Sequence, residues 1–201
     1  MESKSTRRLI WIPIIHTESD LGSLSTNCED LYTQKMGAGK WEERRKTVEE
    51  LWQAICRGVA DLPLDYERVR LYQDGLPNCG YEDRIVGDLA AAGSQNHLLL
   101  ANLIAQGAKL TGTESPELLK EEYELHCDTL ASAAATETQA GADQRKRRAN
   151  DILRRRDLYI AQRINNTLAD GETGLVFLGM LHSIQNYLAM DMEFSILGGL
   201  K

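Results

Sequence analysis

Two short segments of this sequence are apolar on both faces, and they restrict the folds open to the chain. Residues 9–15 read Leu-Ile-Trp-Ile-Pro-Ile-Ile, and residues 175–178 read Leu-Val-Phe-Leu. Short apolar runs rich in β-branched and aromatic residues are typical of strands buried on both faces of a sheet. Such strands belong to parallel sheets covered by helices on both sides. The two segments therefore predict an α/β fold.

The rest of the chain alternates between helical and strand-like patterns. Apolar spacing predicts helices, including a short one near the C-terminus, over residues 41–60, 82–92, 95–106, 115–130, 144–169 and 183–188. Alternation or short apolar runs predict further strands at residues 69–73, 108–111 and 192–197. No hairpin signal joins the strands, so we expect them to pair in parallel. Pro13 removes a ladder hydrogen bond and predicts that its strand is bent or lies near an edge.

The same pattern describes the domain organisation. We find no internal repeat and no linker long enough to divide the chain, so we predict that residues 1–201 form a single α/β domain. The fold is expected to be helix-rich, with a mostly parallel central sheet of about four to five strands flanked by helices. Residues 131–143 are rich in alanine and threonine, and we expect either a flexible loop or a partly ordered helix there.

Composition excludes several classes of function. The net charge of −7 and the pI near 5.2 argue against a nucleic-acid-binding protein, which needs a basic face. No apolar run approaches the ~18 residues of a membrane span, and the N-terminal residues make a poor export signal. The four cysteines have no paired spacing, which argues against a zinc knuckle and a disulfide framework. We therefore expect a cytoplasmic protein with no membrane contact.

Ionisable residues follow the predicted strands. His16 comes after the first strand, with Glu18 close behind, and Asp74, Glu114 and His182 follow three later strands. Because ligands of parallel sheets bind beyond the carboxyl ends of the strands, these side chains are expected to meet at one edge. Imidazole and carboxylate groups together are typical ligands of a catalytic divalent metal. The same groups can also perform acid–base chemistry without a metal.

Each of these residues also has a structural explanation. A histidine at a strand end, such as His16, is often a loop residue that hydrogen-bonds the backbone, and Asp74 precedes a glycine as many turn residues do. Glu114 can stabilise the amino end of the next helix, and His182 can cap a helix. The two other histidines, His97 and His126, lie within predicted helices and are expected to be structural or exposed.

The predicted helix over residues 144–169 carries an arginine on its apolar side. At 100° per residue, its apolar face comprises Ala149, Leu153, Ile160, Ile164 and Thr167. Arg156 falls within this face and Asp157 lies on its flank. Because an unpaired buried charge is strongly unfavourable, Arg156 must find a partner. That partner is a structural acid, a catalytic carboxylate or an anionic group of a substrate.

Four short motifs, in this order along the chain, resemble a broad group of proteins. The group contains TraB-like proteins, Tiki-type metalloproteases, ChaN-like haem-binding proteins and erythromycin esterases. The matching segments are Ile14-Ile15-His16 with Glu18, Gly112-Thr113-Glu114, Arg156-Asp157-Leu158-Tyr159-Ile160-Ala161 and Leu178-Gly179-Met180-Leu181-His182. Pro13 stands where the group has its first glycine. The resemblance implies a compact α/β fold whose polar pocket serves peptide hydrolysis with a metal, ester hydrolysis or haem binding.

The leading hypothesis is a metal-dependent hydrolase that cleaves a peptide or ester bond in a small molecule or peptide. His16, Glu114 and His182 would bind a divalent cation (Zn, Mn or Fe), and Glu18 or Asp74 would act as the base. Arg156 would orient a carboxylate or stabilise developing negative charge. The alternatives are a non-catalytic module that binds a small ligand or haem, and a scaffold that binds a partner protein. A homo-oligomer is common enough to be considered, although no residue argues for it.

Overall fold

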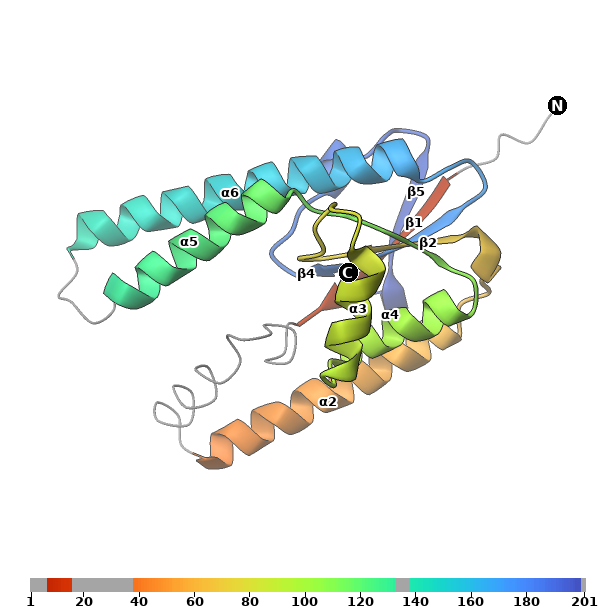
Figure 1. Ribbon diagram of the computed structural model, residues 1–201, viewed down its shortest axis with the longest axis horizontal. Helices are drawn as coiled ribbons and strands as arrows, with labels where there is room; N and C mark the ends of the chain where they lie inside the picture. The colour runs from red at the N-terminus through yellow and green to blue at the C-terminus, as the bar shows by residue number, and fades with distance from the viewer. Residues whose placement is uncertain (1–6, 16–37, 133–137, 200–201) are drawn as a thin grey trace.

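A computed structural model describes residues 7–15, 38–132 and 138–199 of the chain. In these residues five parallel strands form one sheet in the order β3-β2-β4-β1-β5 (Figure 1). The strands, in chain order, are β1 (Arg7–Ile14), β2 (Val69–Gln73), β3 (Lys109–Thr111), β4 (Thr173–Gly179) and β5 (Met192–Ile196). The predicted α/β fold with a parallel sheet is confirmed.

Helices connect the strands and make the fold helix-rich, as predicted. The α-helices are α2 (Ala38–Ala60), α3 (Glu82–Ala91), α4 (Gln95–Ala105), α5 (Pro116–Ser132) and α6 (Gln139–Thr167). Short 3-10 turns are η2 (Tyr66–Arg68), η3 (Gln185–Tyr187) and η4 (Leu197–Gly199). The helix predicted over residues 183–188 is wrong, because only the three-residue turn η3 forms there.

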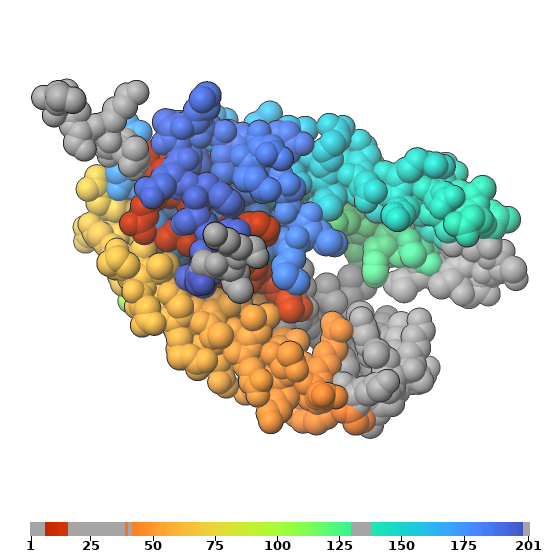
Figure 2. Space-filling model, turned by 180° about the vertical axis from the view of Figure 1, so that it is seen from behind, coloured from red at the N-terminus to blue at the C-terminus, as the bar shows by residue number. Residues whose placement is uncertain are grey.

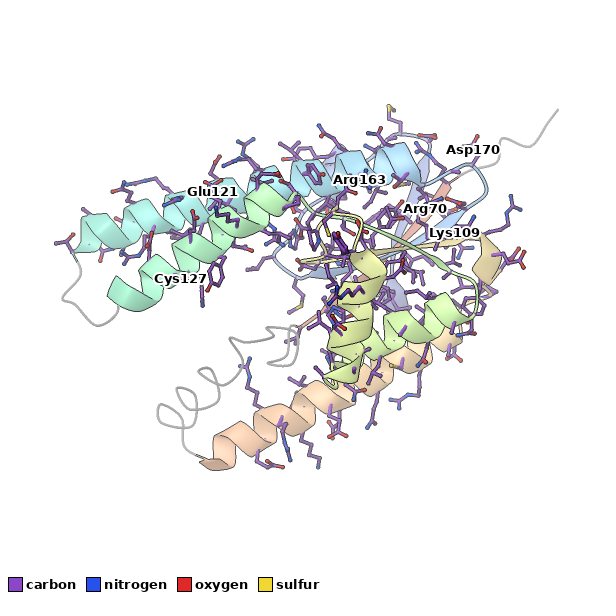
Figure 3. The ribbon with its side chains drawn as sticks, viewed as in Figure 1. Arg70, Lys109, Glu121, Cys127, Arg163 and Asp170 are labelled. Carbon is purple, nitrogen blue, oxygen red and sulfur yellow. The ribbon has the colours of Figure 1, made fainter. Side chains whose placement is uncertain are left out.

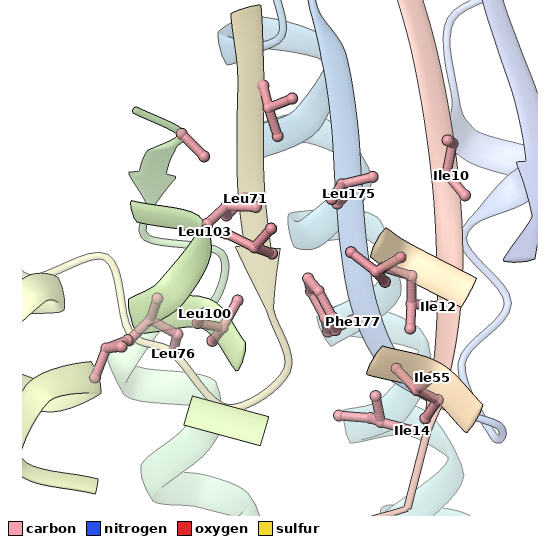
Figure 4. Close-up of a cluster of buried hydrophobic side chains, with 14 of the residues drawn as sticks. Ile10, Ile12, Ile14, Ile55, Leu71, Leu76, Leu100, Leu103, Leu175 and Phe177 are labelled. Atoms are coloured by element: carbon pink, nitrogen blue, oxygen red, sulfur yellow. The ribbon is translucent and has the colours of Figure 1, made fainter. Parts of the chain in front are cut away.

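The two faces of the sheet are covered by different helices. On one face, Ile10, Ile12 and Phe177 pack with side chains of α2, α3 and α4, and Figure 4 labels Ile55 of α2 and Leu100 of α4 in this cluster. On the other face, Leu9, Val176 and Leu178 pack against the buried apolar side chains of α6. Both central strands are therefore apolar on both sides, which explains the two apolar runs in the sequence.

Pro13 lies where one neighbouring strand has already ended. It pairs with Leu178 of β4, but the pairing of β1 with β5 stops at Trp11 and Ile196. The chain is therefore next to an edge at this point, in agreement with the prediction for a proline in a strand.

Helix α6 differs from its prediction at the N-terminal end. It begins at Gln139 rather than at residue 144, because the Oγ1 of Thr138 accepts the N–H of Gly141 as an N-cap. Ala149 was expected on the buried face but is exposed, since α5 and α6 extend side by side beyond the sheet (Figures 1 and 2). Residues 131–143 were expected to form a flexible loop or a partly ordered helix: residues 131–132 end α5, residues 139–143 begin α6, and residues 133–137 lie outside the described part of the chain.

Ion pairs and backbone contacts hold α6 against its neighbours. Arg155 of α6 donates to Glu121 of α5 at 2.9 Å, and Figure 3 labels Glu121 between the two helices. Arg163, labelled in the same view, donates to the backbone oxygen of Gly112 at 3.0 Å. In the described ranges, no helix combines the length and apolarity needed to cross a membrane.

Gly112 provides a test of how the loop after β3 packs. A Cβ atom at this position would lie 2.5 Å from the Cα of Asn78 and 3.0 Å from the backbone oxygen of Pro77. Backbone atoms cannot move aside as side chains do, so Gly112→Ala is expected to lower the free energy of unfolding by about 1–3 kcal/mol. Chemical denaturation measures this loss.

Gly87→Ala is the matched control, because Gly87 lies in α3 with open space where its Cβ would be. This substitution is expected to stabilise the protein by up to about 1 kcal/mol, since alanine favours helix. Equal effects of the two substitutions would contradict the close packing at Gly112.

Candidate functional site

Four ionisable side chains meet at the carboxyl ends of the strands. Asp74 follows β2, Glu114 follows β3, His182 follows β4, and Arg156 projects from α6. All four residues are more than nine-tenths buried. They converge because parallel strands end at the same edge of the sheet.

The loops after β2 and β3 are tied together by backbone and side-chain hydrogen bonds. The N–H groups of Thr113 and Glu114 both donate to the backbone oxygen of Leu76, and the N–H of Gln73 donates to Oγ1 of Thr113. Gly75 has a φ of 74°, a conformation that glycine adopts without strain, and this allows the sharp turn directly after Asp74. The two loops therefore place Asp74 and Glu114 as one unit.

Arg156 lies at the centre of the cluster and contacts three carboxylates. Its Nη2 donates to Oδ1 of Asp74 and to Oε1 of Glu114, both at 2.6 Å, and its Nε donates to Oε2 of Glu114 at 3.2 Å. Its Nη1 donates to the half-buried Glu122 of α5 at 2.6 Å. Burial lowers the pKa of the Arg156 guanidinium, but Glu114, Asp74 and Glu122 raise it by more. The net shift of its pKa is therefore upward. The partner that the sequence required for a buried arginine is thus a set of three acids.

His182 is held between two aspartates. Its Nδ1 lies 2.6 Å from Oδ1 of Asp157, and its Nε2 lies 3.3 Å from Oδ2 of Asp74. The backbone N–H of Gly179 also donates to Oδ2 of Asp74 at 3.0 Å. Burial lowers the pKa of His182, but Asp157 and Asp74 raise it more, to about 9. His182 is therefore an imidazolium at neutral pH.

Glu114 is the most deeply buried member of the cluster. Burial raises the pKa of its carboxyl group, Arg156 lowers it, and Asp74 raises it again, so that the net direction is upward. Two carboxylates that share one arginine in a buried site are thus poised to accept a proton or a cation.

Asp74, Arg156 and His182 line a cavity of about 530 Å³, whereas Glu114 is fully buried beside them and does not line it. The polar lining of the cavity, apart from backbone groups, comprises Gln73, Asp74, His97, Glu122, Arg156 and His182. His97 is buried, and its Nδ1 lies 2.7 Å from Oγ of Ser94. The volume falls within the range of about 300–1,000 Å³ that is usual for small-molecule sites.

The structure brings together most of the residues that the sequence singled out. Asp74, Glu114, Arg156 and His182 share one site, whereas His16 and Glu18 lie outside the described residues.

Sequence reasoning missed three contributors to the site: Asp157, Glu122 and the cavity-lining His97. An aspartate beside a buried arginine on a helix was a signal for Asp157, because neither charge is buried without a partner. His97 was expected to be structural or exposed. It lines the cavity because α4, which carries it, packs against one face of the sheet.

The donor set suits a divalent cation. Among the described residues, Asp74, Glu114 and His182 each offer one ligand atom, and these atoms lie within 4.8 Å of one another. If all three carboxylates are ionised and Arg156 and His182 are protonated, the set of Asp74, Glu114, Asp157, Arg156 and His182 carries a net formal charge of −1. Replacement of the His182 proton by a divalent cation would make this buried set neutral.

Comparison of the chain with protein-family models, curated proteins and solved structures finds no match. The resemblance to the group of TraB, Tiki, ChaN and erythromycin esterase proteins therefore stays a prediction. The chemistry of the site is inferred from its own side chains.

Removal of Arg156 tests its role as the common partner of the buried acids. In Arg156→Ala, Asp74 and Glu114 would stay buried without a counter-charge, and the free energy of unfolding is expected to fall by about 3–5 kcal/mol at pH 7. The loss should be smaller at pH 5, where the carboxyls take up protons more readily. Urea denaturation at the two pH values measures both effects.

Arg154→Ala is the control, since Arg154 is exposed and pairs with Asp151 at the surface. Its effect should stay within about 1 kcal/mol. A loss below that value for Arg156→Ala would contradict a buried network that depends on this arginine.

The protonation of His182 predicts a pH-dependent stability. Its pKa is about 9 in the folded protein and 6.5 without perturbation, so the charged ring stabilises the fold fully below pH 6.5. This contribution, at most about 3 kcal/mol, is lost as the pH rises through 9. The difference in unfolding free energy between the wild type and His182→Gln, with a chelator present, should therefore fall between pH 6.5 and pH 9.

His126→Gln is the control for this measurement, because His126 is exposed on α5. Its free energy of unfolding should stay within about 0.5 kcal/mol of the wild-type value, as is usual for a substitution at an exposed position. A flat or rising difference for His182→Gln would show that the imidazolium is not held by its two aspartates.

Proposed function

We propose that this protein is a metal-dependent hydrolase of peptide or ester bonds, with its site at Asp74, Glu114 and His182. The observation that carries the proposal is the position of His182. Asp157 holds Nδ1 of the ring at 2.6 Å, and this directs Nε2 toward Asp74. Histidines that bind metals are typically oriented in this way, with a carboxylate on the ring nitrogen that faces away from the metal.

The site offers both nitrogen and oxygen ligands, a combination that suits Zn, Mn or Fe. A bound divalent cation would supply Lewis acidity, which polarises a carbonyl group and lowers the pKa of water. His16, expected as a further ligand, lies outside the described residues, so the described donors are Asp74, Glu114 and His182.

The side chains of this chain have separate tasks in the proposed reaction. Arg156 keeps Asp74 and Glu114 at a fixed separation through hydrogen bonds of 2.6 Å, so that both carboxylates are oriented before a substrate binds. Asp74 lies 3.3 Å from Nε2 of His182, so in the metal-dependent reaction it would bind the cation beside this nitrogen, and Glu18, the other candidate base, lies outside the described residues. Asp157 keeps the ring of His182 in one orientation throughout.

Hydrolysis without a metal is the second candidate, and a specific contact favours it. Arg156 already donates to both Asp74 and Glu114, as a counter-ion would. In that case Asp157, His182 and Asp74 would act as an acid–base relay. The small-ligand or haem-binding module and the partner-binding scaffold stay untested predictions, as do a cytoplasmic location and a small-molecule or peptide substrate.

Elemental analysis of purified protein tests the metal. The wild type is expected to carry nearly one equivalent of Zn, Mn or Fe, and His182→Ala is expected to lose it. Asp157→Asn should weaken metal affinity by about 10-fold to 100-fold, because it removes the group that orients the ring. Hydrolysis of peptide and ester substrates should fall in parallel in both variants.

His126→Ala, at an exposed position on α5, is the matched control and should retain metal and activity. A wild type that takes up no metal from an excess of Zn, Mn and Fe would overturn the metal-dependent reaction. Hydrolysis that persists in a chelator but is lost in His182→Ala would identify the metal-free relay instead.

A further inference from the structure

The cavity beside the charged cluster is larger than the chemistry of hydrolysis requires. Its volume is about 530 Å³, whereas a water molecule occupies about 30 Å³ in the liquid. Much of the wall away from the charged groups is apolar, with contributions from Ile15, Ile85, Leu89, Leu119, Leu153 and Leu181. An apolar layer that only shielded the charges from water would be packed tight and would leave no such space.

The apolar wall is built by several separate elements. Ile15 follows β1, Leu89 belongs to α3, Leu119 to α5 and Leu153 to α6, and all four are half-buried rather than part of the core. Apolar surface left open to water is unfavourable, and a ligand with a matching apolar group would cover it. The wall therefore indicates a ligand that is itself partly apolar.

The rim of the cavity is apolar as well. Met180 and Leu181 lie between Gly179 and His182, and they are 67% and 83% exposed. Large apolar side chains exposed beside a polar site mark a binding surface, and methionine adapts its shape to varied apolar partners. The same short loop thus carries an apolar rim and the histidine of the site.

We propose that the substrate carries an uncharged apolar chain of several carbons on the acyl side of the ester or amide bond that is cleaved. The carbonyl would face Asp74, Arg156 and His182, and the chain would lie along Leu89, Leu119 and Leu153 of the wall. A charged group in the apolar part of the cavity would lack a partner and would be rejected. That this ligand is a substrate rests on the proposed function, whereas its chemical class is inferred from the lining of the cavity alone.

A series of primary amides tests this class directly. Binding of butanamide, hexanamide and octanamide to the full-length wild type is measured by calorimetry. Affinity is expected to rise roughly threefold to fourfold for each methylene group that the wall covers. Leu153→Trp and Leu89→Phe narrow the cavity from two helices, so each should remove most of the gain from butanamide to octanamide while butanamide binding changes little.

Met190→Trp is the control, since Met190 is fully exposed and does not line the cavity. It should bind all three amides as the wild type does. Two variants on different helices are used so that the test still stands if one of them fails to fold. Circular dichroism checks that each variant is folded. Affinity that does not depend on chain length, or a dependence that survives both substitutions, would overturn the proposal.

Turnover separates this inference from the proposed function. It is measured as release of ammonia from the amides and of ethanol from the matching ethyl esters. Chain-length-dependent binding without turnover of either series under any metal condition would support the ligand class and overturn the hydrolase. Equal kcat/KM values for short and long esters would support the hydrolase and overturn the apolar specificity.

Discussion

The guanidinium group of Arg156 is the interaction on which the rest of the site depends. It joins Asp74 after β2, Glu114 after β3 and Glu122 on α5 to helix α6, so four parts of the fold meet at one side chain. Two of these acids are buried and would not stay ionised without it. The burial of a positive charge under the edge of the sheet is thus compensated by the same contacts that assemble the site.

The ion pairs that compensate the burial of Arg156 also leave a net negative charge around His182. Arg156 balances the charges of Asp74 and Glu114 only in part, and Asp157 brings a further negative charge to His182. The remaining charge favours a proton on His182 or a cation in its place. The apolar wall next to the cluster keeps these electrostatic interactions strong by lowering the local polarity. Charge and apolar surface in one cavity together suit a hydrolase that acts on a neutral, apolar substrate.

Particular residues show where prediction from the sequence succeeded and where it did not. The apolar residues 9–15 and 175–178 predicted the two central strands, which the structure has as β1 and β4, because burial on both faces leaves a continuous apolar run. Ala149 was placed on a buried face wrongly, because helical periodicity does not reveal that α6 extends past the sheet. His97 was missed as a member of the site, since nothing in its local sequence identifies the cavity that it lines, and Asp157 was missed although it directly follows the buried Arg156.

The sequence by itself determined the α/β class, the parallel pairing and the edge at which ionisable residues gather. These properties follow from local periodicity and from the order of strands and helices along the chain. Only the tertiary structure decided which side chains meet. Arg156 hydrogen-bonds to Asp74, which lies 82 residues away in the sequence, and Gly179 hydrogen-bonds to the same aspartate from a separation of 105 residues. Such contacts depend on strand order and helix packing, because hydrogen bonds require atoms to lie about 3 Å apart whatever their separation along the chain.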